Sequence, residues 1–206
     1  MCSYLLDPGK GEPVLDICAG LGGKSIHIAE LMEDKGRMIA LDISHSRLVR
    51  LSQSLYRLGT GCIDPVVADA GNQLSSLFSC LFDKIFIDAP CSGLGTISKH
   101  PDGKWTRDPD DIIRLSRLQR NILNEAVPLL RSGGKILYVT CAISREENEE
   151  VVYYFLKNNR TMVQENLKEH IPQWGIDLID DQGFLRTFPH IHRTDGFFGA
   201  LFSKRY

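Results

Sequence analysis

Short apolar segments alternate with segments of helical periodicity over the first two-thirds of the chain. Apolar runs of this length between amphipathic helices are typical of a mainly parallel sheet with helices on both faces. Strands are predicted over 13–18, 37–42, 65–68, 84–88 and 135–140, and helices over 24–32, 45–58, 112–126 and 144–157. The pattern therefore predicts an α/β fold, with one doubly wound domain over 1–206.

The end of the chain follows a different pattern. Residues 184–188 and 197–203 read as two strands around a loop, which predicts an antiparallel hairpin at one edge of the sheet. The polar segment 91–109 is long for a connection between a strand and a helix, and loops of that length are usually functional or mobile.

Polar residues mark the ends of two predicted helices. Ser44 is placed to cap the second helix and Gly59 to end it. Ser144 and Glu147 have the S-x-x-E spacing of a capping box, which predicts that the last helix begins there. The amino terminus of that helix would lie close behind Cys141 and help a thiolate to form.

Residues that suit a nucleoside follow the predicted strands. In open α/β sheets, ligands bind beyond the carboxyl ends of the strands. Asp42, Asp69 and Asp88 end the second, third and fourth strands. Asp42 follows Gly20 by 22 positions, a distance at which a carboxylate can accept hydrogen bonds from both ribose hydroxyls. The first strand runs into a glycine-rich turn made by Cys18, Ala19, Gly20, Leu21, Gly22, Gly23 and Lys24.

The three carboxylates narrow the choice of cofactor. They would repel the phosphates of a dinucleotide but suit a ribose, an adenine amine and a sulfonium cation. S-adenosyl-L-methionine therefore fits this edge better than a nicotinamide dinucleotide does. A dinucleotide would also satisfy Asp42, however, and each of these residues taken singly is equally compatible with an ordinary strand–helix turn.

Two cysteines follow central strands beside this predicted site. Cys91 stands in DAPCSG and Cys141 in YVTC, both in polar, turn-like contexts. Carbon 5 of cytosine takes a methyl group only after a thiolate has added to carbon 6. A carboxyl at the ring edge of the base, such as Asp88, would favour that addition, and a base must then remove the carbon 5 proton. The remaining four cysteines, Cys2, Cys18, Cys62 and Cys80, are interpreted as packing residues.

Composition limits the partners and the compartment. The 206 residues carry 24 Lys and Arg against 26 Asp and Glu, a formal net charge of −2, so any RNA-binding surface must be local. No apolar run is long enough to span a membrane, and no secretory signal is visible. Scattered cysteines without metal-ligand spacing predict free thiols, no metal site and a cytoplasmic protein.

Four segments resemble successive motifs of the Sun-type RNA (cytosine-5) methyltransferases. They are DICAGLGGK, DAPCSG, TCAISREENE and RTFPHIHRTDGFFGALFSK; they occur in the family's order, and the resemblance extends over nearly the whole chain. Within that family, the bacterial small-subunit ribosomal-RNA enzymes are the most similar. The resemblance implies a class I S-adenosylmethionine-dependent methyltransferase (Rossmann-like) fold, with the cofactor held along 18–24 and by Asp42, Asp69 and Asp88.

The resemblance also implies roles for the two cysteines. Cys141 is the nucleophile that attacks carbon 6, and Cys91 is needed to resolve the covalent intermediate. The family turn usually reads CAAPGGK, so Gly20 and Leu21 depart from it, as does Ala142 where serine is usual. The family carries an amino-terminal RNA-binding extension, whereas this sequence begins almost at its first strand. We therefore expect a catalytic domain without that extension.

Other functions stay open on the sequence alone. A transfer-RNA cytosine-5 methyltransferase, or an inactive ribosome-assembly module of the same fold that binds RNA, would show the same motifs. A nucleotide-dependent oxidoreductase would explain the glycines and Asp42 but leaves both cysteines unexplained. Candidate RNA contacts, diluted by neighbouring acids, are Lys99, Lys104, Arg107, Arg114, Arg117, Arg120, His190, His192 and Arg193.

Overall fold

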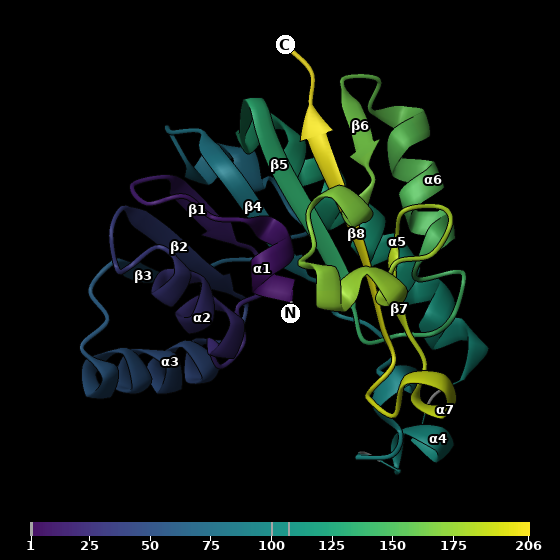
Figure 1. Ribbon diagram of the computed structural model, residues 1–206. Helices are drawn as coiled ribbons and strands as arrows, with labels where there is room; N and C mark the ends of the chain where they lie inside the picture. The colour runs from purple at the N-terminus through teal and green to yellow at the C-terminus, as the bar shows by residue number, and fades with distance from the viewer. Residues whose placement is uncertain (1, 100, 107) are drawn as a thin grey trace.

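A single mixed sheet forms the centre of the computed structural model, which describes residues 2–99, 101–106 and 108–206 (Figure 1). Within these residues the eight strands run in the order β3-β2-β1-β4-β5-β8-β6, and β7 pairs with β8. The strands are β1 (Pro13–Asp16), β2 (Arg37–Asp42), β3 (Ile63–Val67), β4 (Phe82–Asp88), β5 (Leu130–Thr140), β6 (Met162–Glu165), β7 (Leu185–Thr187) and β8 (Phe197–Lys204).

The sheet is parallel from β3 to β5 and antiparallel beyond it. The predicted hairpin is confirmed, because β7 pairs antiparallel with β8, with Thr187 opposite Phe197. On its other side β8 pairs antiparallel with β5 along six residues. β6, which the sequence pattern did not reveal, continues the line of β7 along the far edge of β8. The order reverses between β1 and β4, and a ligand site is expected there.

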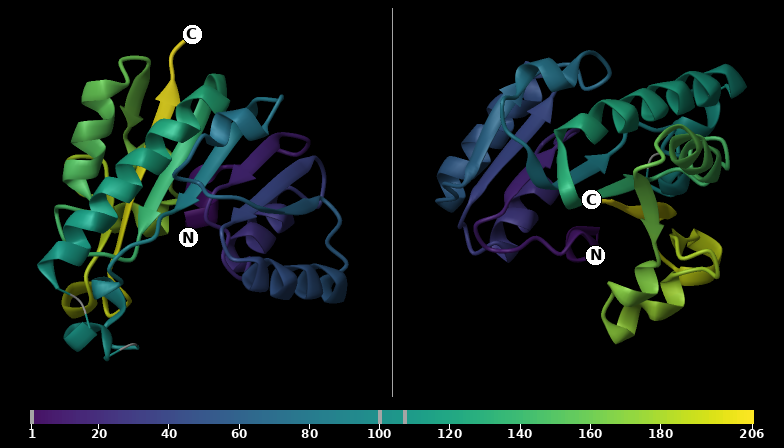
Figure 2. Two further views of the ribbon diagram at one scale, coloured as in Figure 1. Left: turned by 180° about the vertical axis from the view of Figure 1, so that it is seen from behind. Right: turned by 90° about the horizontal axis from the view of Figure 1, so that it is seen from above.

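Helices cover both faces of the sheet (Figure 2). The α-helices are α1 (Cys2–Leu6), α2 (Gly23–Leu31), α3 (His45–Leu58), α4 (Gly103–Thr106), α5 (Pro109–Ala126), α6 (Glu149–Asn158) and α7 (Pro189–His192). Short 3-10 helices are η1 (Leu74–Leu77), η2 (Leu94–Thr96), η3 (Val127–Leu129), η4 (Leu167–Glu169) and η5 (Gln173–Leu178).

Two hydrophobic cores lie on opposite faces of the sheet. Alternate strand residues point to opposite faces, so Ile85 packs with α5 and α6, whereas its neighbour Phe86 packs with α1, α2 and α3. Burial on both faces explains the near-continuous apolar runs of the central strands. This double packing fixes the carboxyl ends of β1, β2 and β4, from which the site residues project.

The helix ends agree with the sequence prediction at α3 and differ at α6. Ser44 and Gly59 do flank α3, and Gly59 has the left-handed φ of 70° that ends many helices, but the Ser44 side chain makes no capping hydrogen bond. The expected capping box at Ser144 is wrong, because α6 begins only at Glu149 and residues 145–148 form turns. The Glu147 carboxylate instead accepts from Ser92 of a different loop and from the Ser144 hydroxyl, so it does not serve a helix terminus.

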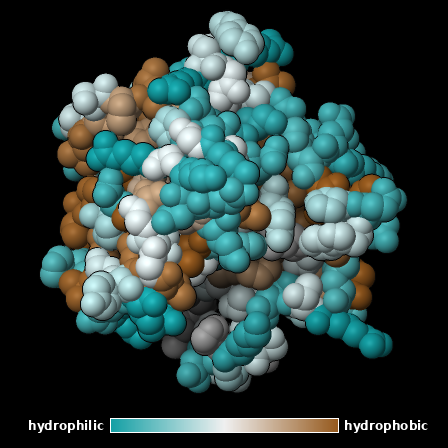
Figure 3. Space-filling model, turned by 60° about the vertical axis from the view of Figure 1, so that its left-hand side comes forward, coloured by the Kyte–Doolittle hydropathy of each residue, from teal (hydrophilic) through white to brown (hydrophobic). Residues whose placement is uncertain are grey.

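The surface is mixed in polarity. Hydrophilic side chains cover most of the face in Figure 3, with hydrophobic ones between them. None of the helices in the described parts of the chain is long and apolar enough to cross a membrane.

Candidate active site

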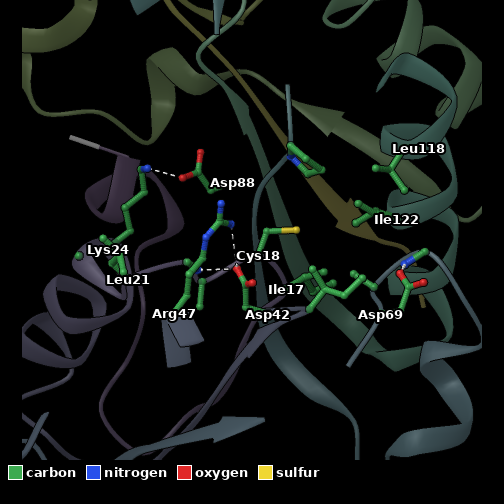
Figure 4. A pocket seen from close by; sticks show the side chains of 17 residues that line it. Ile17, Cys18, Leu21, Lys24, Asp42, Arg47, Asp69, Asp88, Leu118 and Ile122 are labelled. Atoms are coloured by element: carbon green, nitrogen blue, oxygen red, sulfur yellow. Dashed lines mark hydrogen bonds and ion pairs between the residues drawn. The ribbon is translucent and has the colours of Figure 1, made fainter. Parts of the chain in front are cut away.

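A cavity of ≈ 540 Å³ opens at the carboxyl ends of β1, β2 and β4 (Figure 4). Most residues predicted to hold a cofactor line it: Cys18, Ala19, Gly20, Leu21, Gly23, Lys24, Asp42, Asp69 and Asp88. The exception is Gly22, which lies behind the turn. Its φ is 83°, and a Cβ there would come within 2.1 Å of the buried Leu51 side chain. Gly22 therefore shapes the turn from behind, outside the wall of the cavity.

Asp42 is the most firmly held of the three carboxylates. It is buried at the end of β2, where its Oδ2 accepts from the Gly20 N–H at 2.9 Å and its Oδ1 from the Ser44 N–H at 2.8 Å. The Arg47 guanidinium approaches Oδ2 at 3.8 Å. These contacts tie the glycine turn to the start of α3 and fix the carboxylate at the wall of the cavity.

Asp88 and Asp69 complete the acidic rim. Asp88, at the end of β4, forms a partly buried ion pair with Lys24 from the first turn of α2. Burial lowers the pKa of Lys24, but the charge and hydrogen bond of Asp88 raise it by more, so the ammonium is retained. Asp69 accepts from the Gly71 N–H at 2.9 Å and so holds its own turn while facing the cavity.

The sequence analysis missed much of the apolar wall. Leu118 and Ile122 of α5 face the cavity opposite the glycine turn. Ile43, Arg47, Ala70 and Pro90 also line it. Ile43 and Arg47 directly follow the strand that ends in Asp42, which is the signal that could have found them.

The two predicted catalytic cysteines meet. Cys91 follows β4, Cys141 follows β5, and their Sγ atoms are 3.2 Å apart. The adjacent parallel strands bring them together, since Asp88 lies opposite Val139 in the β4–β5 register. Backbone bonds lock this arrangement. The Gly95 N–H donates to the Cys141 carbonyl at 2.8 Å, and a Cβ at Gly95 would lie within 2.7 Å of the same oxygen.

The pair is electrostatically unequal. The hydrogen bond from Cys91 lowers the pKa of Cys141, although burial and the nearby Asp88 act in the opposite direction. The same hydrogen bond, together with burial, raises the pKa of Cys91 well above its usual value. Cys141 is therefore the more readily ionised of the two thiols.

The other cysteines behave differently. All six are free, as predicted. Burial raises the pKa of Cys18 well above its usual value, and the neighbouring Asp16 adds to the effect, so Cys18 contributes a thiol to the cavity wall. Among the described residues, no group of three or more His, Cys, Asp or Glu side chains is placed to hold a metal ion.

The basic residues proposed to contact RNA are largely engaged within the protein. Lys99 forms a 2.6 Å ion pair with Asp195, and Arg114 a 2.8 Å pair with Asp111. The Arg120 guanidinium lies 4.8 Å from the centre of the Tyr154 ring. The Lys104 side chain and Arg107 lie outside the described residues.

Comparison with known proteins identifies the family. The sequence model described as "16S rRNA methyltransferase RsmB/F" matches residues 3–203, nearly the whole chain. The chain belongs to this RsmB/F family. The resemblance inferred from the four motifs is thereby confirmed.

Relatives in the RsmB/F family are similar over this chain but longer. "Probable ribosomal RNA small subunit methyltransferase B" of Bacillus subtilis is 40% identical over 201 residues, covering 97% of this chain and 45% of the relative. "Ribosomal RNA small subunit methyltransferase B" of Proteus mirabilis is 35% identical over 206 residues, covering 99% and 44%. The chain thus spans about half the length of these RsmB/F relatives.

Solved structures confirm the class I methyltransferase fold. NSun6 from Pyrococcus horikoshii, crystallised with SFG, has a TM-score of 0.86 and 35% identity, covering 100% of this chain and 51% of that one. A methyltransferase homologue from the same organism has a TM-score of 0.81 and 33% identity, covering 99% and 66%. A streptococcal methyltransferase solved with SAH shares the fold at a TM-score of 0.62 and 11% identity.

Proposed function

We propose that this chain is the catalytic domain of an S-adenosylmethionine-dependent RNA (cytosine-5) methyltransferase, with small-subunit ribosomal RNA as its substrate. The observation that carries the proposal is the contact between the Cys91 and Cys141 sulfurs at the end of the sheet that also holds the acidic cavity. The names of the relatives and the SFG and SAH ligands of the structural neighbours support it.

The cavity fits S-adenosylmethionine. A Cβ at Gly20 or Gly23 would meet no protein atom within 4 Å, so the backbone of the turn is open to a ligand. We assign Asp42 to the ribose hydroxyls and the apolar side chains of Ile43 and Leu118 to the adenine ring. Asp69 and Asp88 add negative charge that suits a cationic sulfonium and excludes phosphates.

The reaction at the cytosine ring is carried out by side chains of this protein. The bound cofactor supplies an electrophilic methyl group. The Cys141 thiolate bonds to carbon 6 of cytosine, and the ring electrons move to carbon 5, which takes that methyl group. Asp88, oriented by Lys24, interacts with the ring edge and favours the addition. Removal of the carbon 5 proton then restores the ring double bond and returns the electron pair to the Cys141 sulfur. We assign that proton to Cys91, which takes it as a thiolate after giving its own proton to solvent once Cys141 is bonded to the base.

Asp42→Asn is expected to weaken binding of S-adenosylhomocysteine about 10- to 100-fold, because hydrogen bonds to a charged acceptor are stronger than those to a neutral amide. Isothermal titration calorimetry measures the affinity. The matched control is Asp64→Asn, an exposed aspartate on β3 outside the cavity. Unchanged affinity in Asp42→Asn would place the ribose elsewhere.

A covalent-adduct gel tests the reaction itself. Cys91→Ala is incubated with S-adenosylmethionine and small-subunit ribosomal RNA that lacks cytosine methylation, then run under denaturing conditions. We expect an RNA–protein band that survives denaturation, because the adduct forms at Cys141 but is not resolved. The band should be absent from the double variant that also carries Cys141→Ala.

Two further lanes separate the alternatives. Transfer RNA in place of ribosomal RNA tests the other substrate class, and already methylated ribosomal RNA is the negative control. A band that persists without Cys141 contradicts the assigned nucleophile. No band with either RNA, from protein that binds S-adenosylhomocysteine, contradicts the proposed activity of this chain.

A further inference from the structure

A buried carboxylate outside the cavity joins the loops that carry the two cysteines. Glu147, in the turn between β5 and α6, has no exposed surface. Its Oε1 accepts from the Ser92 N–H at 2.7 Å, and its Oε2 accepts from the Ser92 hydroxyl at 2.5 Å and the Ser144 hydroxyl at 2.8 Å. Ser92 directly follows Cys91, and Ser144 lies three residues after Cys141.

The long helix α5 supports the same junction. The Gln119 amide, which is fully buried, donates to Glu147 Oε1 at 3.2 Å and to the Pro90 carbonyl at 2.9 Å. Pro90 directly precedes Cys91. The Tyr138 hydroxyl donates to the Glu147 backbone carbonyl at 2.7 Å and anchors the turn from below.

All four donors to the Glu147 carboxylate are neutral groups. Both of its oxygens accept, which is the pattern of an acceptor-only group. A buried carboxylate held in this way fixes its donors strongly, because each would lose its partner inside the protein if the carboxylate were removed.

The neighbouring Asn148 serves only one of the two loops. It bonds to the Thr140 hydroxyl at 2.7 Å and to the Ala142 carbonyl at 3.1 Å, on either side of Cys141. Cys141 is therefore held by its own strand and turn. Besides the backbone bond from Gly95 to Cys141, the Cys91 loop is held over Cys141 by Glu147 and Gln119.

We propose that Glu147 is a positioning residue that holds Cys91 against Cys141, so that resolution of the RNA adduct depends on it more than formation does. The inference rests on the proposed function. In the resolving step, Cys91 first gives its thiol proton to solvent and then takes the carbon 5 proton. The carbon 5–carbon 6 double bond forms, and the pair of the carbon–sulfur bond returns to Cys141. A displaced Cys91 slows this step directly, whereas attack by Cys141 is affected only through the pKa of its thiol.

A thiol titration without RNA tests the positioning directly. The rate of Cys141 alkylation by iodoacetamide is followed against pH by peptide mass spectrometry. Besides Cys91, the charged groups that act on Cys141 are Asp88 and Lys24, which all the variants retain. In Glu147→Gln the inflection should move to higher pH, as in Cys91→Ala, because Cys141 loses its hydrogen bond. Glu146→Gln, at the exposed neighbouring glutamate, should match the parent. An unchanged profile in Glu147→Gln overturns the proposal.

The adduct supplies the second readout. With ribosomal RNA and cofactor, Glu147→Gln should form adduct within about threefold of the parent rate but resolve it at least about tenfold more slowly. Adduct should therefore accumulate with Cys91 still present. Equal slowing of both steps, with weaker S-adenosylhomocysteine binding, would indicate a general structural role and overturn the proposal.

If Glu147→Gln does not fold, a less disruptive substitution tests the same proposal. Ser92→Ala removes one hydroxyl bond and leaves the Ser92 N–H in place, so its effects should be smaller but in the same direction. If neither the parent nor Cys91→Ala yields any adduct, the proposed function fails, and the thiol titration still decides the role of Glu147.

Discussion

Replacing Cys141 by serine is expected to abolish methyl transfer to RNA, lowering the rate by at least about 10³-fold, the order of loss that follows removal of a covalent nucleophile. A serine hydroxyl ionises far less readily than a thiol whose pKa is already lowered by Cys91, so it does not add to carbon 6. The measurement is transfer of radiolabelled methyl groups to unmethylated ribosomal RNA in a single turnover. S-adenosylhomocysteine should bind the variant normally.

Two other cysteine variants serve as comparisons for Cys141→Ser. Cys80→Ser, at the exposed cysteine, should retain the parent rate. Cys91→Ala should also lose turnover but, unlike Cys141→Ser, keep the covalent adduct. Methyl transfer that survives in Cys141→Ser would show that another group attacks the base.

The pH dependence of the first turnover follows from the same pair. The thiolate fraction of Cys141 grows as the pH rises, so the rate should increase and level off once the pH exceeds its pKa. Because the Cys91 hydrogen bond lowers that pKa, the plateau should begin below the ordinary thiol range near 9.0. In Cys91→Ala the rise in the rate of adduct formation should move to higher pH.

The parts of the fold that depend on local sequence were predictable. The strand over 37–42 matches β2, and Ser44 and Gly59 flank α3, because hydrophobic period and helix-end residues act within a few positions. β6 has only four residues and pairs across a long separation with β8, so no local pattern marks it. Its partner strand decides its structure.

The site residues also divide into those that local sequence predicts and those that depend on tertiary contacts. Asp42, Asp69 and Asp88 were found because parallel strands bring their carboxyl ends to one edge. Glu147 was read as a helix cap, since the S-x-x-E spacing is local evidence. It also accepts from Ser92, which is 55 positions away in the chain. The hydrogen-bond donors of a buried acceptor are set by the tertiary structure. Residues near the acceptor in the sequence therefore do not reveal them.

Asp16 is expected to make the protein less stable as the pH rises. It ends β1 and is buried directly beneath the glycine turn. Burial raises its pKa from 3.8 to about 7, although a 2.7 Å hydrogen bond from the Ser25 hydroxyl opposes the shift. Its Oδ1 has no hydrogen-bond partner among the described residues. The folded protein thus favours the neutral acid, whereas the unfolded chain ionises it near its ordinary value.

The sign of the effect follows from linkage. A group whose pKa is higher in the folded state than in the unfolded state stabilises the folded protein. That stabilisation is fully present below the unfolded pKa and is lost as the pH rises through the folded pKa. For Asp16 the window runs from 3.8 to about 7, and the loss is about 4 kcal/mol of unfolding free energy. The asparagine of Asp16→Asn stays neutral at every pH. Between pH 4 and pH 8 the free energy of unfolding of this variant should therefore rise by about 4 kcal/mol relative to that of the parent.

Urea denaturation at a series of pH values measures this difference. The control is Asp177→Asn, an exposed aspartate whose variant should follow the parent curve. Parallel curves for Asp16→Asn and the parent would show that Asp16 is ionised in the folded protein. The expected divergence would mean that a neutral acid joins β1 to α2 through Ser25 and supports the turn that lines the cavity. That turn would then lose support once the pH rises above about 7.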